Sequence, residues 1–336
     1  MDAMCLLKSS VNKRERLTGR PAGRIASAIA RRVLPLLLVL LVAACAVPRP
    51  VIKIALVAPF EGYYREVGYD AFPAMRLALR EQIRAGGVGN YEVSFVAYND
   101  NADPVFAERV AHNVALDDNV IAVIGNLRPD TTVAALSVYT SSLLPVIVTD
   151  IPADAAPSGS LVFRMGPSTS ALVDALKRCP GAGSPGNAPW LQPYKGEVSA
   201  FALEHLSDFQ SPAAYKTIGG SIAGLCFATA TPYPRDLPAA DKALAQFAEV
   251  SGTTGAGPRS ISAHDATRLL LRAIEDDIAA HGRPTRSGVA EALRQISYNG
   301  LLGNIRFDEN NRWASAPVWI YQYEADGVAR MIGNTQ

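Results

Sequence analysis

The residues best suited to hold a small charged molecule form a short segment in the first half of this 336-residue chain. Arg128 could donate a forked pair of hydrogen bonds to a carboxylate, and Thr131 and Thr132 offer hydroxyls, with Asp130 between them. The segment leads into a helix expected from Pro129, and the free N–H groups and dipole of such a helix suit an anion. The alternative is that Pro129, Asp130 and Thr131 only start the helix.

Aromatic and acidic residues elsewhere could complete such a site. Tyr63 and Tyr64, together with Tyr69, could form an aromatic wall, and Asp150 could hold an ammonium group. Each tyrosine could instead be a surface or packing residue, and Asp150 could be only a turn residue. We expect no metal site and no cofactor, because no CxxC motif and no Cys/His spacing typical of a metal centre occurs.

The elements that must position these residues alternate between strands and helices from residue 52 onward. Asp103 followed by Pro104 is typical of a helix start, and Gly86 and Gly87 end the helix before it. Repeated units of this kind predict a doubly wound parallel sheet, an α/β fold with helices on both faces. Strands are expected at 52–59, 91–98, 120–124, 145–148 and 161–165, and helices at 71–85, 103–115 and 129–142.

In open parallel sheets, ligands bind beyond the carboxyl ends of the strands, where the strand order reverses. Two predicted loops follow strands that could flank this point, at residues 60–69 and 126–132. The candidate tyrosines lie in the first loop, and Arg128 and its neighbours lie in the second.

The N-terminal segment has the features of a secretion signal. An apolar run at 33–44 follows a leader that includes Arg31 and Arg32, and it is too short to span a bilayer comfortably. The run ends in Val-Ala-Ala before Cys45, which resembles the lipobox of bacterial lipoproteins. This resemblance implies a signal peptide at 1–44 and a lipidated tether at 45–51. The alternative is an ordinary secretory signal with a chance cysteine.

Charge and cysteine usage limit the remaining functions. Residues 1–44 hold eight lysines and arginines against two acidic residues, whereas the rest holds 24 against 29, so no basic stripe for nucleic acid is expected. Beyond Cys5 and Cys45 only Cys179 and Cys226 remain; they could form a disulfide or stay two separate buried thiols. We expect no enzyme, since no nucleophile–base set is evident. The four histidines share no metal spacing: His112, His205, His264 and His281.

Several sequence blocks follow one another in a recognisable order: IKIALVAPF at 52–60, YNDNADP at 98–104, VIG at 123–125, LPVI at 144–147, GLCFAT at 224–229 and GLLGNIRFD at 300–308. Together they resemble the type I periplasmic binding proteins, and within them the leucine/isoleucine/valine-binding family of ABC importers. Proteins of this family bind a small ligand between two lobes that close around it, and deliver it to a permease.

This resemblance implies a first lobe at 52–166 and a second lobe with hinge crossings and a C-terminal hairpin at 167–336. The second lobe is expected to be shortened, because the stretch between residues 166 and 220 lacks about two strand–helix units, or roughly 60 residues. In place of the serine/threonine run of the relatives, Arg128, Pro129 and Asp130 precede Thr131, and Asp150 stands where small residues are usual.

The expected function is an extracytoplasmic lipoprotein that binds an amino acid or a similar small polar ligand for an ABC permease. It would be held on a bacterial cell membrane by a lipid on Cys45. The alternative is a non-transporting envelope lipoprotein that uses the same scaffold to bind a protein partner.

Overall fold

The computed structural model describes residues 48–149, 161–179, 226–252 and 255–335. The predicted signal peptide, Cys45 and Asp150 lie outside these ranges. From Arg49 onward the chain forms one compact unit. None of the helices in the described ranges combines the length and apolar character needed to cross a membrane.

In the part of the chain that the structure describes, five parallel strands form the main sheet, in the order β2-β1-β3-β4-β5. Helices connect the successive strands from β1 to β4, so the prediction of a doubly wound parallel sheet is confirmed. The strands are β1 Val51–Ala58, β2 Glu92–Asn99, β3 Val120–Gly125, β4 Val146–Val148 and β5 Val162–Arg164.

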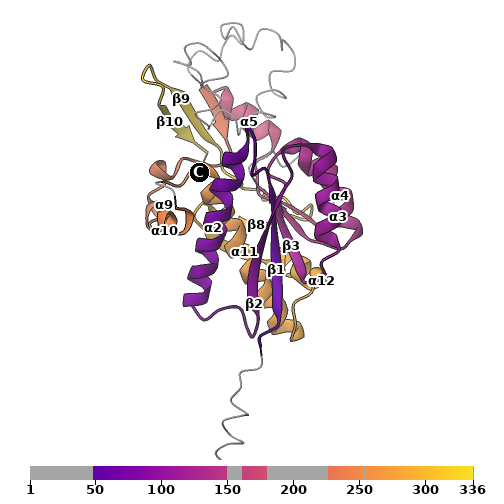
Figure 1. Ribbon diagram of the computed structural model, residues 1–336. Coiled ribbons are helices and arrows are strands. Elements are labelled where there is room, and N and C mark those ends of the chain that lie inside the picture. The colour runs from indigo at the N-terminus through magenta and orange to yellow at the C-terminus, as the bar shows by residue number, and fades with distance from the viewer. Residues whose placement is uncertain (1–47, 150–160, 180–225, 253–254, 336) are drawn as a thin grey trace, which may run out of the picture. The chain divides into compact units, whose positions relative to one another are not determined.

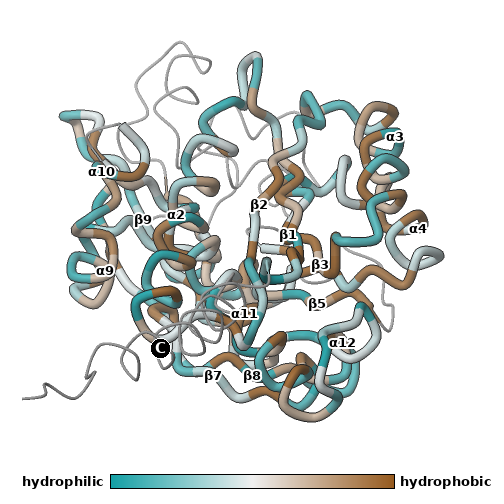
Figure 2. The backbone as a smooth tube through the Cα atoms, turned by 60° about the horizontal axis from the view of Figure 1, so that its bottom comes forward, coloured by the Kyte–Doolittle hydropathy of each residue, from teal (hydrophilic) through white to brown (hydrophobic). Residues whose placement is uncertain are grey.

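Helices cover both faces of this sheet (Figure 1). Side chains alternate along β1, so Ala55 and Val57 pack toward α3 and α4, whereas Ile54 and Leu56 pack toward α2 and α11. Figure 2 shows the apolar character of β1 and β3, which are covered on both sides. The covering helices are α2 Arg65–Arg84, α3 Pro104–Ala115, α4 Pro129–Ser141, α11 Pro258–His281 and α12 Arg286–Gln295.

A second, antiparallel sheet has three strands in the described residues, in the order β10-β9-β6. Helix α5 packs against β6 and β9, and a disulfide joins Cys179, just after α5, to Cys226 at the start of β6. Of the two states that the sequence left open for these cysteines, the structure has the bonded one. The elements are α5 Thr169–Leu176, β6 Cys226–Thr229, the 3-10 helix Pro234–Asp236, α9 Pro238–Ala243, α10 Phe247–Ser251, β7 Ser297–Gly300, β8 Gly303–Arg306, β9 Trp319–Tyr323 and β10 Ala329–Asn334.

The loop expected at 60–69 is shorter than predicted, because α2 already begins at Arg65. The first turn of α2 carries exposed polar residues, so apolar spacing does not reveal it. Gly68 lets this turn approach the end of β1: a Cβ there would lie 2.7 Å from the carbonyl oxygen of Pro59. Tyr69, placed in the loop by the sequence analysis, is therefore a helical residue.

Helix α11 returns the chain to the first sheet and is held at its start by α2. The carboxylate of Asp70 accepts hydrogen bonds from the backbone N–H groups of Gly257 (2.6 Å) and Arg259 (2.9 Å) and from the Ser260 hydroxyl (2.5 Å). Gly257, the N-cap residue, has no side chain to cap the helix. Asp70 therefore supplies from another helix the cap that α11 lacks.

A buried histidine lies further along the same pair of helices. Nε2 of His264 in α11 lies 2.9 Å from a carboxylate oxygen of Glu81 in α2, and Nδ1 lies 3.8 Å from Asp265. Burial alone would lower the pKa of His264, but the carboxylates of Asp265 and Glu81 outweigh it and leave the pKa raised. Asp265 also accepts the N–H groups of Leu301 and Leu302 in the β7–β8 turn.

Arg286, the first residue of α12, joins four backbone carbonyl groups. Its Nε donates to Val120 O (2.9 Å), Nη1 to Ser142 O (2.9 Å), and Nη2 to Asp117 O (2.9 Å) and Ala115 O (3.3 Å). Ala115 ends α3, Ser142 is the C-cap of α4, and Val120 starts β3. One guanidinium thus satisfies carbonyl groups at the ends of two helices, where a positive charge is favourable.

Candidate functional site

The order of the main sheet reverses between β1 and β3, so the loops that follow these two strands leave from neighbouring positions. Gly125 at the end of β3 has φ +130°, and a Cβ there would lie 2.3 Å from the carbonyl oxygen of Val57 in β1. Only glycine allows this approach of the two strand ends. The sequence analysis predicted that the strand order reverses between the first and third strands, and the structure confirms this.

Arg128 in the second loop meets the tyrosines of the first. Its guanidinium carbon lies 3.8 Å from the ring centroid of Tyr64, a cation–π contact, and its side chain is 9% exposed. The ring of Tyr63 lies edge-to-face against that of Tyr64, with centroids 4.9 Å apart. Tyr63 is 53% exposed and Tyr64 is partly buried. The structure therefore brings Arg128 together with two candidate tyrosines that lie more than 60 positions earlier in the sequence.

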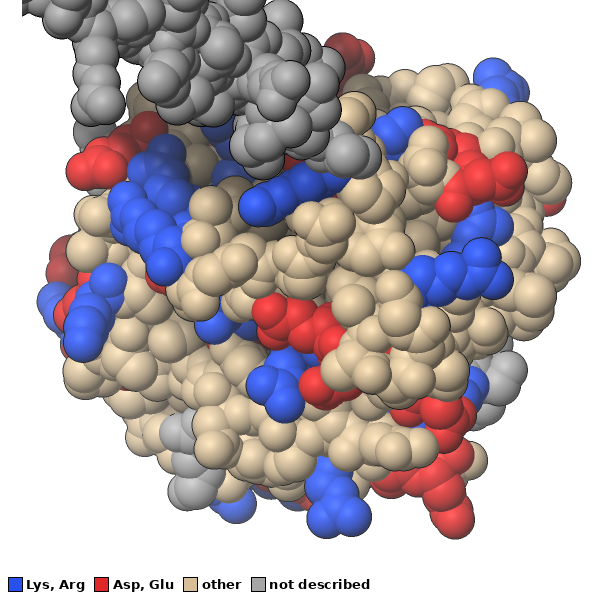
Figure 3. Space-filling model, turned by 90° about the horizontal axis from the view of Figure 1, so that it is seen from below, with Lys and Arg blue, Asp and Glu red and all other residues tan. Residues whose placement is uncertain are grey.

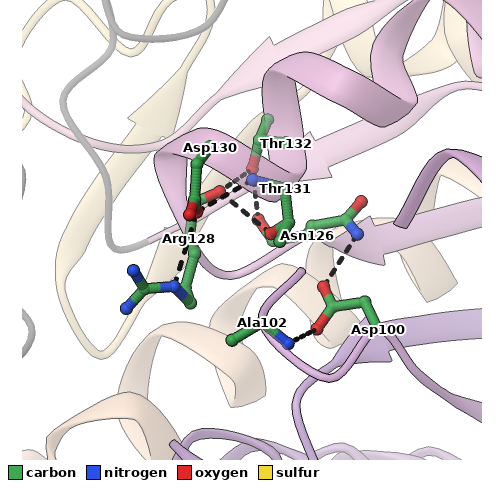
Figure 4. A network of polar contacts seen from close by, with 7 residues as sticks. All are labelled: Asp100, Ala102, Asn126, Arg128, Asp130, Thr131 and Thr132. Atoms are coloured by element: carbon green, nitrogen blue, oxygen red, sulfur yellow. Dashed lines mark hydrogen bonds and ion pairs between the residues drawn. The ribbon is translucent and has the colours of Figure 1, made fainter. Parts of the chain in front are cut away.

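Asp130 is the negatively charged partner within this group. Its Oδ1 accepts a hydrogen bond from the backbone N–H of Thr131 (2.9 Å) and lies 3.4 Å from Nε of Arg128 (Figure 4). The Asp130 side chain is 39% exposed. A carboxylate of the chain itself thus lies at the start of α4, between the arginine and a backbone N–H group.

Thr131 and Thr132 lie beneath this surface and are fully buried. The hydroxyl of Thr132 donates to the carbonyl oxygens of Asn126 and Arg128, each at 2.6 Å, and that of Thr131 donates to Arg128 O at 3.3 Å (Figure 4). In this arrangement the two threonines shape the loop, whereas Asp130 and Tyr63 are exposed and Arg128 is buried against Tyr64. Asp150 lies outside the described residues.

A buried polar pair supports the loop from below. Asn126 donates from Nδ2 to Asp100 (2.9 Å) and accepts from the Tyr139 hydroxyl (3.3 Å), and Ala102 N also donates to Asp100 (3.0 Å). Burial raises the pKa of Asp100 although these donors act in the opposite direction, and burial likewise raises the pKa of Tyr139.

The sequence analysis did not single out Asp100 and Asn126, although their positions could have indicated them. Asp100 directly follows β2 and Asn126 directly follows β3, so both lie at the carboxyl edge where parallel strands end together. The apolar and helical patterns used to place the elements carry no signal for such residues.

Arg128 and the tyrosines beside it suit the binding of a small molecule. An arginine on an aromatic face can hold an anion or a flat group, and no group of three metal-binding side chains occurs in the part of the chain that the structure describes. Figure 3 shows basic and acidic side chains interspersed on one face of the molecule rather than gathered by sign.

Comparison with protein families matches residues 51–178 and 206–328 to the periplasmic binding proteins. Among curated sequences none matches the chain. Several solved structures are similar to it. A leucine-binding protein from Thermotoga maritima has a TM-score of 0.64 at 17% identity, over 85% of this chain and 99% of that one.

Two further structures are similar at comparable coverage. One is a branched-chain amino acid transporter substrate-binding protein from Streptococcus pneumoniae in complex with isoleucine, with TM-score 0.62, 12% identity, and coverage of 84% of this chain and 98% of that one. The other is an ABC transporter solute-binding protein from R. palustris in complex with benzoate, with TM-score 0.62, 15% identity, and coverage of 84% and 96%.

The family match covers most of the chain, and the structural likeness agrees with the strand order and the switch point described above. These relatives are solute-binding proteins of ABC transporters. The chain therefore belongs to the periplasmic binding protein family and has the type I fold of its leucine/isoleucine/valine-binding branch.

Proposed function

We propose that this protein is the solute-binding component of an ABC importer and binds a small carboxylate-bearing ligand such as an amino acid. The observation that carries the proposal is the meeting of Arg128 with Tyr64 at the switch point of the sheet. The ligands named for relatives, leucine, isoleucine and benzoate, all carry a carboxylate beside an apolar group. A guanidinium next to two tyrosine rings matches both parts of such a molecule.

The proposed mechanism is closure of two lobes around the ligand. The ligand would stabilise the closed state by as much as it binds that state more tightly than the open state. Tyr63, Tyr64 and Arg128 would contact the ligand from the first lobe, Asp130 would border the site, and Thr131 and Thr132 would hold their loop in shape. Asp150 is proposed to receive an ammonium group.

We further propose that Cys45 is lipidated after removal of residues 1–44 and holds the protein at the outer face of the cell membrane. Tethering near the permease raises the effective concentration of loaded protein there. The test is metabolic labelling with a fatty acid and membrane fractionation. Wild type should be labelled and sediment with membranes, Cys45→Ala should do neither, and Cys5→Ala should behave as wild type. Labelling of Cys45→Ala would refute the tether.

Calorimetry tests the binding function directly. Residues 46–336 contain the whole compact unit and are titrated with a panel of amino acids and aromatic carboxylates, benzoate included. Arg128→Ala is expected to weaken binding at least tenfold, since a charged hydrogen bond contributes about 1.5–3 kcal/mol. Arg283→Ala, an exposed arginine far along the sequence, is the matched control. Absence of binding across the panel would refute the importer assignment and favour a lipoprotein that binds a protein partner.

A further inference from the structure

Asp130 lies where the carboxylate of a bound ligand would have to go. A carboxylate at the start of α4 can accept the backbone N–H of Thr131 and pair with Arg128, and Asp130 makes both contacts, at 2.9 and 3.4 Å. Arg128 is held against Tyr64 with only 9% of its side chain exposed, so the arginine has little freedom to turn toward a second anion elsewhere.

We infer that Asp130 is a built-in competitor for ligand carboxylates, and that it sets the specificity of the site. This inference rests on the proposed function of the same site. Asp130 already occupies the Thr131 N–H and lies beside Nε of Arg128, and two adjacent carboxylates repel each other, so a ligand carboxylate that takes these contacts must displace Asp130. With 39% of its side chain exposed, Asp130 can turn into water when displaced.

The competition between Asp130 and the ligand depends on the negative charge of the ligand. It therefore affects carboxylate ligands and their amides differently. A carboxylate ligand must break the Arg128–Asp130 pair, whereas an amide of the same shape has no carboxylate charge to place against the guanidinium. Because of this competition, the protein binds carboxylates less tightly than Arg128 alone would allow. The difference in binding affinity between a carboxylate ligand and its amide is therefore smaller than it would be without Asp130.

The test compares wild type with Asp130→Asn against leucine, isoleucine and benzoate, and against leucinamide and benzamide. Asparagine keeps an oxygen for the Thr131 N–H, so the helix start is preserved and only the charge is lost. Asp130→Asn should bind the carboxylates about fivefold more tightly, the upper end of what a partly exposed ion pair contributes. The affinity for neutral benzamide should be unchanged, and the affinity for leucinamide, which carries an ammonium group, should not rise. Thermal unfolding checks that both proteins are folded.

Asp118→Asn is the matched control, because it removes the same charge from an exposed residue before the amino end of β3, away from the carboxyl edge. It should leave every affinity unchanged. Equal or weaker carboxylate binding by Asp130→Asn, or an equal gain for acids and amides, would overturn the inference while leaving the proposed function intact. If neither protein binds any of the five compounds, the proposed carboxylate ligand and the inference both fail.

Discussion

Replacing Arg286 by alanine tests whether one side chain holds the ends of α3, α4 and β3 together. Three of its hydrogen bonds are 2.9 Å long and all come from a charged donor, a type that contributes about 1.5–3 kcal/mol each when buried. Arg286 is only partly buried, so water replaces some of these bonds in the variant. We therefore expect a loss of about 3 kcal/mol in the free energy of unfolding, below the simple sum.

The assay is urea unfolding of residues 46–336 followed by far-ultraviolet circular dichroism. Arg286→Lys keeps the charge near both helix ends but cannot reach four carbonyl oxygens, so it should lose about half as much. Arg283→Ala, exposed in the preceding turn, should change stability by less than about 0.5 kcal/mol. A loss below about 1 kcal/mol for Arg286→Ala, or full stability of Arg286→Lys, would refute the reasoning.

Three further predictions concern the same unfolding measurement. Asp70→Ala should cost about 2 kcal/mol, because α11 loses its cap, and Asp70→Asn should cost less; equal losses would contradict a capping role. His264 has a raised pKa, so its stabilising contribution is complete below the unfolded value of about 6.5 and is lost as pH rises through the raised folded value. The stability difference between wild type and His264→Gln should therefore shrink from pH 6 to pH 9, whereas His112→Gln, an exposed control, should show no such trend. Reduction of the Cys179–Cys226 disulfide, which closes a loop with a sequence separation of 47, should cost about 4 kcal/mol, and the double serine variant should be insensitive to reductant.

Sequence reasoning succeeded where a local pattern and the fold agree. Buried-strand runs, the Asp103–Pro104 helix start and the glycine stops predicted the strands and helices of the first sheet closely. Asp103 does cap α3, accepting the Phe106 N–H at 2.8 Å. The switch point followed from the expected parallel order, and so the loops of the candidate site could be predicted as well.

It failed where the stabilising partner is distant in the sequence. The helices expected from the sequence did not include the start of α11 at Pro258, because Asp70 caps it from α2 and its first turns bury polar residues such as Ser260. The turn between β7 and β8 is likewise held by a distant partner, since Asp265 of α11 accepts the N–H groups of Leu301 and Leu302.

The burial of Thr131 and Thr132 could not be predicted for a similar reason. A hydroxyl next to a helix start can face a ligand or its own loop, and the choice depends on how the carbonyl groups of Asn126 and Arg128 are turned. Likewise, the pairing of Cys179 with Cys226 depends on where α5 packs against β6, which spacing alone does not fix.

Helices α2 and α11 together cover one face of the first sheet, and this affects when the chain can fold during its synthesis. A chain synthesised as far as β5 has the five strands of the first sheet in the described residues, and it has α2, but it lacks α11, which also packs against Ile54 and Leu56. The other helix begins at Pro258, late in the chain, so stable folding is deferred until most of the chain has been made. For the exported protein proposed here, this delay would leave the chain unfolded while it passes through a narrow export channel.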